Sequence, residues 1–396
     1  MKIIGIDDSQ EEVKRLNSKK IVWVASISTI LIIIFILFCV YLGNRQFRNF
    51  IDKYVLMKNV TENNVASIDL DASENNYVYA YHKYISVLNQ NTLIGYNTSG
   101  NKEYELKVEI TDPLVDTNNK FLLIAEKGKQ KIYLISDNSI VWEKQLDGNI
   151  SRISVNKNGY VSVILTGTTY KSIIKTFDES GNELFTTYLS NSIAVDSDIS
   201  YNNKYLSFVE VSTNGTLVQS IIKTISIQKA KETPSDSIKS AVTYQSDSIP
   251  LNLKYQDGNK LICMYDNAIS NIKDETYEDI ISLKEDGKKI TYGDIELSSC
   301  GFRITEKTAL LSTETTVEIT NTSSKRVNIY TIDGVVKDVY CCDNSIALNL
   351  GSEVHFIGTN GWLIKKYTSS QEVRKIVMSS NFAGIIYRDK IEIVEL

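Results

Sequence analysis

The stretch LIGYNTSGNKEY (residues 93–104) superimposes without a gap on IKTFDESGNELF (residues 174–185). Each copy holds an apolar strand, a polar turn that contains Ser-Gly-Asn, and a second strand with an aromatic residue shortly after the turn. Such a pattern predicts a β-hairpin. Weaker copies occur at residues 132–142, 329–336 and 354–362, so the hairpin is an internal repeat.

The hairpins recur about every 40 residues in the first half of the chain and about every 30 near its end, which fits four short strands per unit. Nearly all-apolar segments such as YVSVIL (residues 160–165) lie between them and are typical of strands buried between neighbouring sheets. The pattern predicts an all-β fold, a β-propeller of seven or eight blades. The predicted units span residues 77–109, 110–147, 148–190, 191–246, 247–291, 292–336, 337–368 and 369–396.

The last unit has room for only three strands before the chain ends at Leu396. Residues 65–70 (VASIDL) alternate as a strand and can fill the fourth place, which would close the ring and leave no open sheet edge. The polar stretch from residue 228 to residue 247 is expected to be an exposed excursion from the fourth unit.

An apolar run precedes the repeats. It begins at Ile21 and ends at Leu42, and it contains no charged residue, proline or glycine. A helix of this length rises about 33 Å and can span a bilayer. A cleaved signal peptide would have a shorter apolar core and a small-residue cleavage site, so a retained transmembrane helix is favoured. Cys39 lies inside the run and is expected to face lipid.

The predicted parts are a cytoplasmic tail (residues 1–20), a transmembrane helix (21–42), a stalk (43–62) and the propeller (63–396). Basic residues are slightly more numerous before the helix than after it, which predicts a single-pass cell-membrane protein with the N-terminus cytoplasmic and the propeller extracellular. The basic residues before the helix are Lys2, Lys14, Arg15, Lys19 and Lys20, and those after it are Arg45, Arg48, Lys53 and Lys58.

Composition excludes several classes of function. The net charge is −5 and the propeller has no basic cluster, so nucleic acid is not an expected partner. Five cysteines are too few and too scattered for a disulfide framework, and adjacent Cys341 and Cys342 should point to opposite faces of a strand. No CxxC or HxxxH pattern occurs, so no metal ligands are assigned.

Catalytic motifs are also missing from the sequence. The two histidines, His82 and His355, lie in strand-like segments with no Gly-x-Ser-x-Gly elbow nearby, and no phosphate-binding loop occurs. The carboxylate pairs Asp196/Asp198 and Glu278/Asp279 are expected to be solvated loop charges. No catalytic, cofactor-binding or metal residue is therefore assigned, no cofactor is expected, and we expect a protein that is not an enzyme.

Tyrosine is unusually common, with 23 residues. In YVYAY (residues 77–81) the rings alternate along a strand, so they share one face. They could form structural cross-strand pairs, or an aromatic face that binds glycan or protein.

The repeats resemble those of quinoprotein and WD40-like propellers, in which Asp-x-x-Gly turns precede an apolar or Trp position. The clearest motifs are FDESGN (residues 177–182), VWEKQLDG (141–148) and GSEVHFIG (351–358). A short tail, one membrane helix and then this propeller resemble an uncharacterised family of single-pass membrane proteins from low-GC Gram-positive bacteria, a catalogued domain of unknown function. The resemblance implies fold and location and supplies no catalytic residues.

Together these features predict a membrane-anchored extracytoplasmic propeller that binds or scaffolds an envelope partner, a protein or a cell-wall glycan. One alternative is a sensor that reports ligand binding through the helix to a partner of the tail. Another is an envelope enzyme. Polar groups that converge at the central channel, or lie only at the rim loops, would help to separate these readings.

Overall fold

The computed structural model describes residues 18–43, 45–61, 65–89, 91–212, 218–244, 248–309 and 312–396. The described residues form two compact units, which divide between Asn59 and Val60. Most of the predicted tail, residues 1–17, lies outside the described residues.

The first unit contains two helices, α1 (Ser18–Gly43) and α2 (Arg45–Tyr54). Within α1, the segment Val22–Gly43 is long and apolar enough to cross a membrane, with a mean hydropathy of 2.8. The predicted stalk, residues 43–62, contains the regular helix α2, which is followed by the short strand β1 (Asn59–Thr61).

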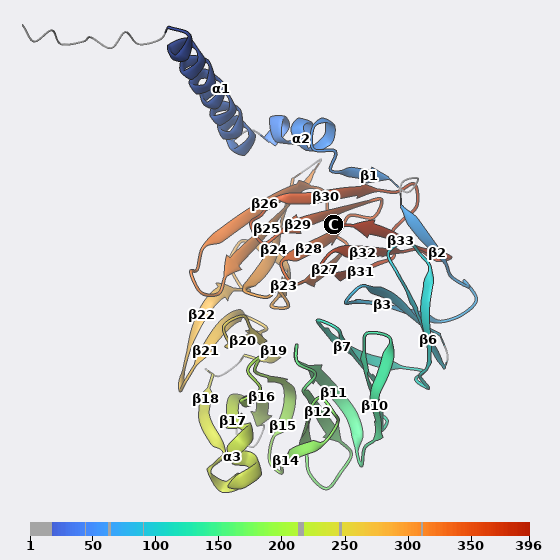
Figure 1. The fold of residues 1–396 in the computed structure, drawn as a ribbon. Coiled ribbons are helices and arrows are strands. Elements are labelled where there is room, and N and C mark those ends of the chain that lie inside the picture. The colour runs from blue at the N-terminus through green and yellow to red at the C-terminus, as the bar shows by residue number, and fades with distance from the viewer. Residues whose placement is uncertain are drawn as a thin grey trace, which may run out of the picture. The chain divides into compact units, whose positions relative to one another are not determined.

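The second unit is a ring of eight four-stranded antiparallel sheets, so the propeller has eight blades (Figure 1). Successive strands of a blade run from the central axis outward, and blade 7 carries β1 as a fifth, outermost strand. Blades 1 to 4 are β3 (Asn76–Tyr81), β4 (Tyr84–Asn89), β5 (Thr92–Tyr96), β6 (Lys102–Lys107); β7 (Pro113–Asn118), β8 (Phe121–Glu126), β9 (Lys131–Ser136), β10 (Ser139–Gln145); β11 (Asn149–Val155), β12 (Val161–Thr166), β13 (Ser172–Phe177), β14 (Glu183–Leu189); and β15 (Ile193–Ile199), β16 (Tyr205–Ser212), β17 (Gln219–Ser226), β18 (Ile238–Thr243).

Blades 5 to 8 follow the same plan, except that blade 8 takes its outermost strand, β2, from the N-terminal side of the domain. Their strands are β19 (Pro250–Gln256), β20 (Lys260–Tyr265), β21 (Ala268–Lys273), β22 (Thr276–Ser282); β23 (Lys289–Asp294), β24 (Cys300–Thr308), β25 (Thr313–Asn321), β26 (Val327–Asp333); β27 (Asp338–Cys342), β28 (Ser345–Asn349), β29 (Glu353–Gly358), β30 (Leu363–Thr368); and β31 (Lys375–Ser379), β32 (Phe382–Ile386), β33 (Lys390–Glu395), β2 (Ala66–Asp69).

The predicted ring closure is confirmed. β2 pairs antiparallel with β33, with Ala66 opposite Ile393 and Ile68 opposite Ile391. Blade 8 is thus assembled from both ends of the domain, and Ile68 and Ile391 are buried in a core shared with blade 1.

The repeated turn has a local physical cause. In blade 1 the Asn97 side-chain oxygen accepts hydrogen bonds from the backbone N–H groups of Ser99 and Asn101, both at 3.0 Å. In blade 3 Asp178 holds Ser180 and Asn182 in the same way, at 2.9 and 2.8 Å. This Asx arrangement fixes the turn that the sequence repeats.

The second strands of several blades are almost entirely buried. Every residue of β8 and of β32 is buried, as is nearly every residue of β12, because these strands lie between the neighbouring blades. Blades 2 and 3 share a cluster in which the rings of Trp142 and Phe177 are 5.9 Å apart.

Two sequence boundaries need correction. The predicted break between residues 291 and 292 falls inside β23, which begins at Lys289. The expected excursion from residue 228 is shorter than predicted: it contains α3 (Ile227–Glu232) and η2 (Pro234–Asp236), and then the chain returns as β18, the outer strand of blade 4. Alternation in residues 238–243 is weak because an outer strand buries few side chains.

Candidate functional site

The innermost strands of the blades surround a central channel that contains a cavity of about 610 Å³. Most of the lining residues come from the second halves of these strands and from the turns that follow them. The cavity therefore lies toward the face at which the innermost strands end, which we call the strand-end face. The opposite face is the strand-start face. Polar and aromatic side chains of the lining include Asp116, Tyr201, Lys254, Tyr292, Asp294, Glu296 and Tyr340.

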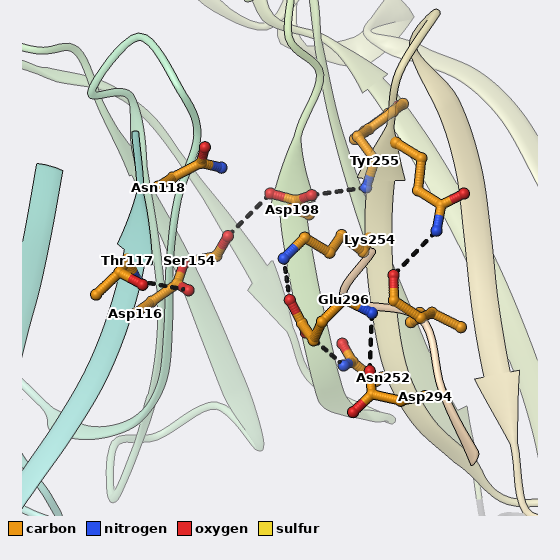
Figure 2. A network of polar contacts seen from close by, with 12 residues as sticks. Asp116, Thr117, Asn118, Ser154, Asp198, Asn252, Lys254, Tyr255, Asp294 and Glu296 are labelled. Atoms are coloured by element: carbon orange, nitrogen blue, oxygen red, sulfur yellow. Dashed lines mark hydrogen bonds and ion pairs between the residues drawn. The ribbon is translucent and has the colours of Figure 1, made fainter. Parts of the chain in front are cut away.

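An ion pair between Lys254 of β19 and Glu296 dominates one side of the channel (Figure 2). The Asn252 amide donates a second hydrogen bond to Glu296, at 2.9 Å. Burial alone would lower the pKa of Lys254, but the nearby Glu296 carboxylate outweighs it and holds this pKa well above its usual range. Burial alone would raise the pKa of Glu296, but the Lys254 charge outweighs this effect, so the pKa of Glu296 is lowered. Both groups are therefore ionised near neutral pH.

Asp294 sits next to this pair. It accepts hydrogen bonds from the Glu296 backbone N–H at 2.7 Å and from the Tyr292 hydroxyl at 3.0 Å. Burial and the nearby Glu296 charge raise the pKa of Asp294. The carboxyl thus serves mainly to fix the bend that follows β23.

Three further aspartates join neighbouring blades. Asp116 accepts the backbone N–H of Val155 at 2.7 Å, which links blade 2 to blade 3. Asp196 and Asp198 of β15 accept the N–H groups of Leu253 and Tyr255, at 2.9 and 2.7 Å, which links blade 4 to blade 5. Burial raises the pKa of Asp116 to about 7 and those of Asp196 and Asp198 to about 6.

The expectation that Asp196 and Asp198 are solvated loop charges is wrong. Both lie within β15 and are buried. The innermost strand of the next blade, β19, has a free edge with no partner strand, so its N–H groups need other acceptors, and the two carboxyl groups supply them. Glu278 and Asp279 are exposed as expected, but they lie on the outer strand β22 rather than in a loop.

The two histidines occupy unrelated positions. His82 is not in a strand: it lies in the turn after β3 with φ 49°, and its Nδ1 is 2.7 Å from an Asp137 carboxylate oxygen. His355 lies on β29 as predicted, with its Nδ1 3.0 Å from the Tyr330 hydroxyl. In the part of the chain that the structure describes, no group of three or more His, Cys, Asp or Glu side chains is placed to hold a metal ion.

All five cysteines are free thiols. Cys341 and Cys342 pack against different core clusters, which agrees with their predicted opposite directions. Burial raises the pKa of the Cys342 thiol to about 12 and holds that of the Cys341 thiol well above its usual range. Neither sulfur is an activated nucleophile.

The tyrosines of residues 77–81 do not form an exposed aromatic face. Tyr81 is 2% exposed, and its hydroxyl lies 2.6 Å from that of Tyr104, so the structural alternative holds here. A different pair, Tyr170 and Tyr188, is exposed at the strand-start face, with ring centroids 4.7 Å apart.

Three aliphatic side chains are exposed on the same face. Ile193 begins β15, and the bond from Ala194 N–H to Ser172 Oγ (3.1 Å) holds it beside the Tyr170 loop. Ile249 and Leu251 are exposed where β19 begins, on the same face of the next blade. We call these five residues the start-face patch: Tyr170, Tyr188, Ile193, Ile249 and Leu251. No sequence motif marks it, because its members come from three blades.

A model of a family of unknown function, DUF5711, matches residues 57–396. The chain belongs to this family. No curated protein sequence matches it significantly.

Solved structures share the DUF5711 protein's fold. The C-terminal WD40 domain of Sif2 is similar over 84% of this chain and 99% of its own length, with 11% identity and a TM-score of 0.53. BamB from Moraxella catarrhalis is similar over 84% of this chain and 97% of its own, with 11% identity and a TM-score of 0.45. At such low identity the likeness to the WD40 domain shows the propeller fold alone.

Proposed function

We propose that this DUF5711 protein is a single-pass, membrane-anchored binding module whose propeller lies outside the cytoplasm and binds an envelope protein. α1 is the anchor, and the slight excess of basic residues before it supports a cytoplasmic N-terminus. The start-face patch is the observation that carries the binding role.

The channel supports binding more than catalysis. Polar groups do converge there, which is the arrangement that could have favoured an enzyme. Their bonds, however, are made within the fold: Asp116 and Asp198 accept backbone N–H groups of neighbouring blades, and Lys254 pairs with Glu296. A catalytic base needs a nucleophile or a substrate proton within reach. Because these carboxylates are bonded to groups of the fold itself, we assign them to joining the blades.

The patch fits a protein partner better than a glycan. Tyr188, Ile193 and Ile249 are 49–56% exposed, and large apolar side chains next to tyrosine are typical of the centre of protein interfaces. A glycan site would place polar hydrogen-bonding groups around a flat ring, whereas the Tyr170 and Tyr188 rings are tilted by 43°.

Photocrosslinking in cells tests this role. A photoreactive benzoylphenylalanine replaces Tyr188 in the full chain, and the matched control replaces Ile238, which is 55% exposed at the strand-end side of blade 4. We expect a discrete protein adduct from the first position and none from the second. Equal adducts at both positions, no adduct, or an adduct removed only by a cell-wall hydrolase would contradict a protein partner at this patch.

A ligand sensor is the second candidate, and the channel cavity favours it. The carboxyl groups of Asp116 and Asp294 and the rings of Tyr201 and Tyr340 would suit a small organic cation. Putrescine or tetramethylammonium should then raise the Tm of the wild-type protein and not that of D294N. Equal Tm values with and without both amines would remove this candidate.

A further inference from the structure

The segment that follows α1 has an apolar surface of its own. In α2, Phe47, Phe50, Ile51 and Tyr54 recur at spacings of three and four residues and so form one stripe of the helix. Phe50 and Tyr54 are 55% and 60% exposed, and their ring centroids are 5.1 Å apart. The stripe continues into Val55, Leu56 and Met57, which are 51–77% exposed.

Hydrogen bonds hold α2 against the end of α1. Arg48 donates from Nε to the Tyr41 carbonyl oxygen at 3.1 Å and from Nη2 to the Leu42 carbonyl oxygen at 2.5 Å, so it caps the last turn of α1. The Tyr41 hydroxyl donates to Asp52 at 2.8 Å, and Asp52 pairs with Lys58 at 2.9 Å. These contacts fix the orientation of α2 relative to the last turn of α1.

The charge of the segment is positive. Residues 45–58 contain four basic residues, Arg45, Arg48, Lys53 and Lys58, and one acidic residue, Asp52. Asp52 is 3% exposed and already paired with Lys58. By sequence the segment therefore carries a net charge of +3 beside exposed apolar groups, which is the combination that binds anionic lipid headgroups.

We propose that residues 45–57 lie in the membrane surface, with the apolar stripe in the upper acyl region and the basic groups among the headgroups. This inference rests on the proposed membrane anchor. Only residue 44 separates the two helices, and one residue spans about 3.6 Å, so α2 starts within the interfacial layer if α1 spans the bilayer. The element would set the height at which the chain leaves the membrane.

Tryptophan quenching by brominated lipids in nanodiscs tests the insertion of α1 and the position of the apolar stripe separately, with the full chain. Trp23 of the wild-type protein reports insertion of α1. The pair W23F and W23F/F50W reports the stripe, because the two proteins differ only at residue 50, and Trp142 and Trp362 give the same background in both. We expect the emission added by F50W to be quenched more by lipids brominated near the headgroup than by lipids brominated near the chain end.

Quenching of the added emission should be stronger in discs with phosphatidylglycerol than in discs with phosphatidylcholine alone, and weaker again after R45E/K53E. Quenched Trp23 with unquenched F50W emission would overturn the interfacial element and leave the anchor intact. Unquenched F50W emission in a protein of doubled native mass would assign the stripe to a second copy instead. Unquenched Trp23 would contradict the anchor itself.

Discussion

Blades 3 and 8 have the same four antiparallel strands, but the chain builds them differently. Blade 3 is one continuous stretch from Asn149 to Leu189, so each strand pairs with its neighbour in sequence. Blade 8 joins β31, β32 and β33 to β2, which lies more than 300 residues away in sequence. Blade 3 can form locally, whereas blade 8 requires the rest of the ring to bring its two ends together.

The stability of the domain therefore depends more on the ring closure than on any single hairpin. Loss of one hairpin in blade 3 removes local contacts, but loss of the β2–β33 pairing opens the ring and exposes the edges of blade 8 and the core it shares with blade 1.

Ending the chain at Arg388 removes β33, in which Ile391 and Val394 are fully buried. β2 and β32 then both lose their partner, so we expect the Tm of the full protein to fall by roughly 10 °C or more, with less cooperative unfolding. Circular dichroism in nanodiscs measures this, and a chain ending at Glu395 is the control. Equal melting of both proteins would mean that the closed ring is not the source of stability.

Ile68→Glu places a charge in the closing strand. Ile68 is 4% exposed in the core shared with blade 1, so we expect a loss of about 3 kcal/mol or more in the free energy of unfolding. Ser67→Glu is the matched control because the Ser67 side chain is exposed on the same strand, and its loss should stay below about 0.5 kcal/mol. Chemical denaturation compares the two variants. Similar losses in the two variants would show that the assignment of buried and exposed side chains on β2 is wrong.

Gly181→Ala tests a local feature of blade 3. Gly181 has φ +82°, and an added Cβ would lie 2.8 Å from the Trp142 ring. We expect a loss of about 2 kcal/mol, less than for Ile68→Glu. Gly258→Ala is the control: φ is +77° with no atom within 4 Å of the added carbon, so only the backbone cost of about 1 kcal/mol applies. A larger effect at Gly258 than at Gly181 would contradict the packing argument.

The contacts in the channel, unlike those of the ring closure, should make the stability of the domain depend on pH. Burial raises the pKa of Asp116 to about 7 in the folded state, above the unfolded value near 4. The folded state thus binds more protons between these values, so the stability from this group is complete below about pH 4 and is lost as the pH rises through 7.

Asp116→Asn removes this titration. Its free energy of unfolding relative to wild type should therefore increase between pH 6 and pH 8, by roughly 1–2 kcal/mol. Urea unfolding at the two pH values measures this. A relative stability that stays constant or decreases with pH would show that Asp116 is ionised in the folded state.

Much of the fold could be predicted from the sequence because its signals are local. The Asx turns at Asn97 and Asp178 repeat in the chain itself, and the alternation of residues 65–70 identified the closing strand. The start-face patch could not be predicted, because Tyr188, Ile193 and Leu251 belong to blades 3, 4 and 5 and share one face of the domain only in the folded ring. Asp196 and Asp198 were misjudged for the same reason, since their N–H partners lie 57 residues away in sequence.

If α1 is a retained anchor and the propeller lies outside the cytoplasm, as we propose, a cysteine added to the propeller surface should react with a reagent outside the cell. Val327→Cys places a thiol at a position that is 48% exposed on the outer strand of blade 6. In intact cells without their wall, we expect a membrane-impermeant maleimide to label the full-length variant in the membrane fraction above the wild-type background. Labelling only after permeabilisation, or a shortened protein released into the medium, would contradict the account.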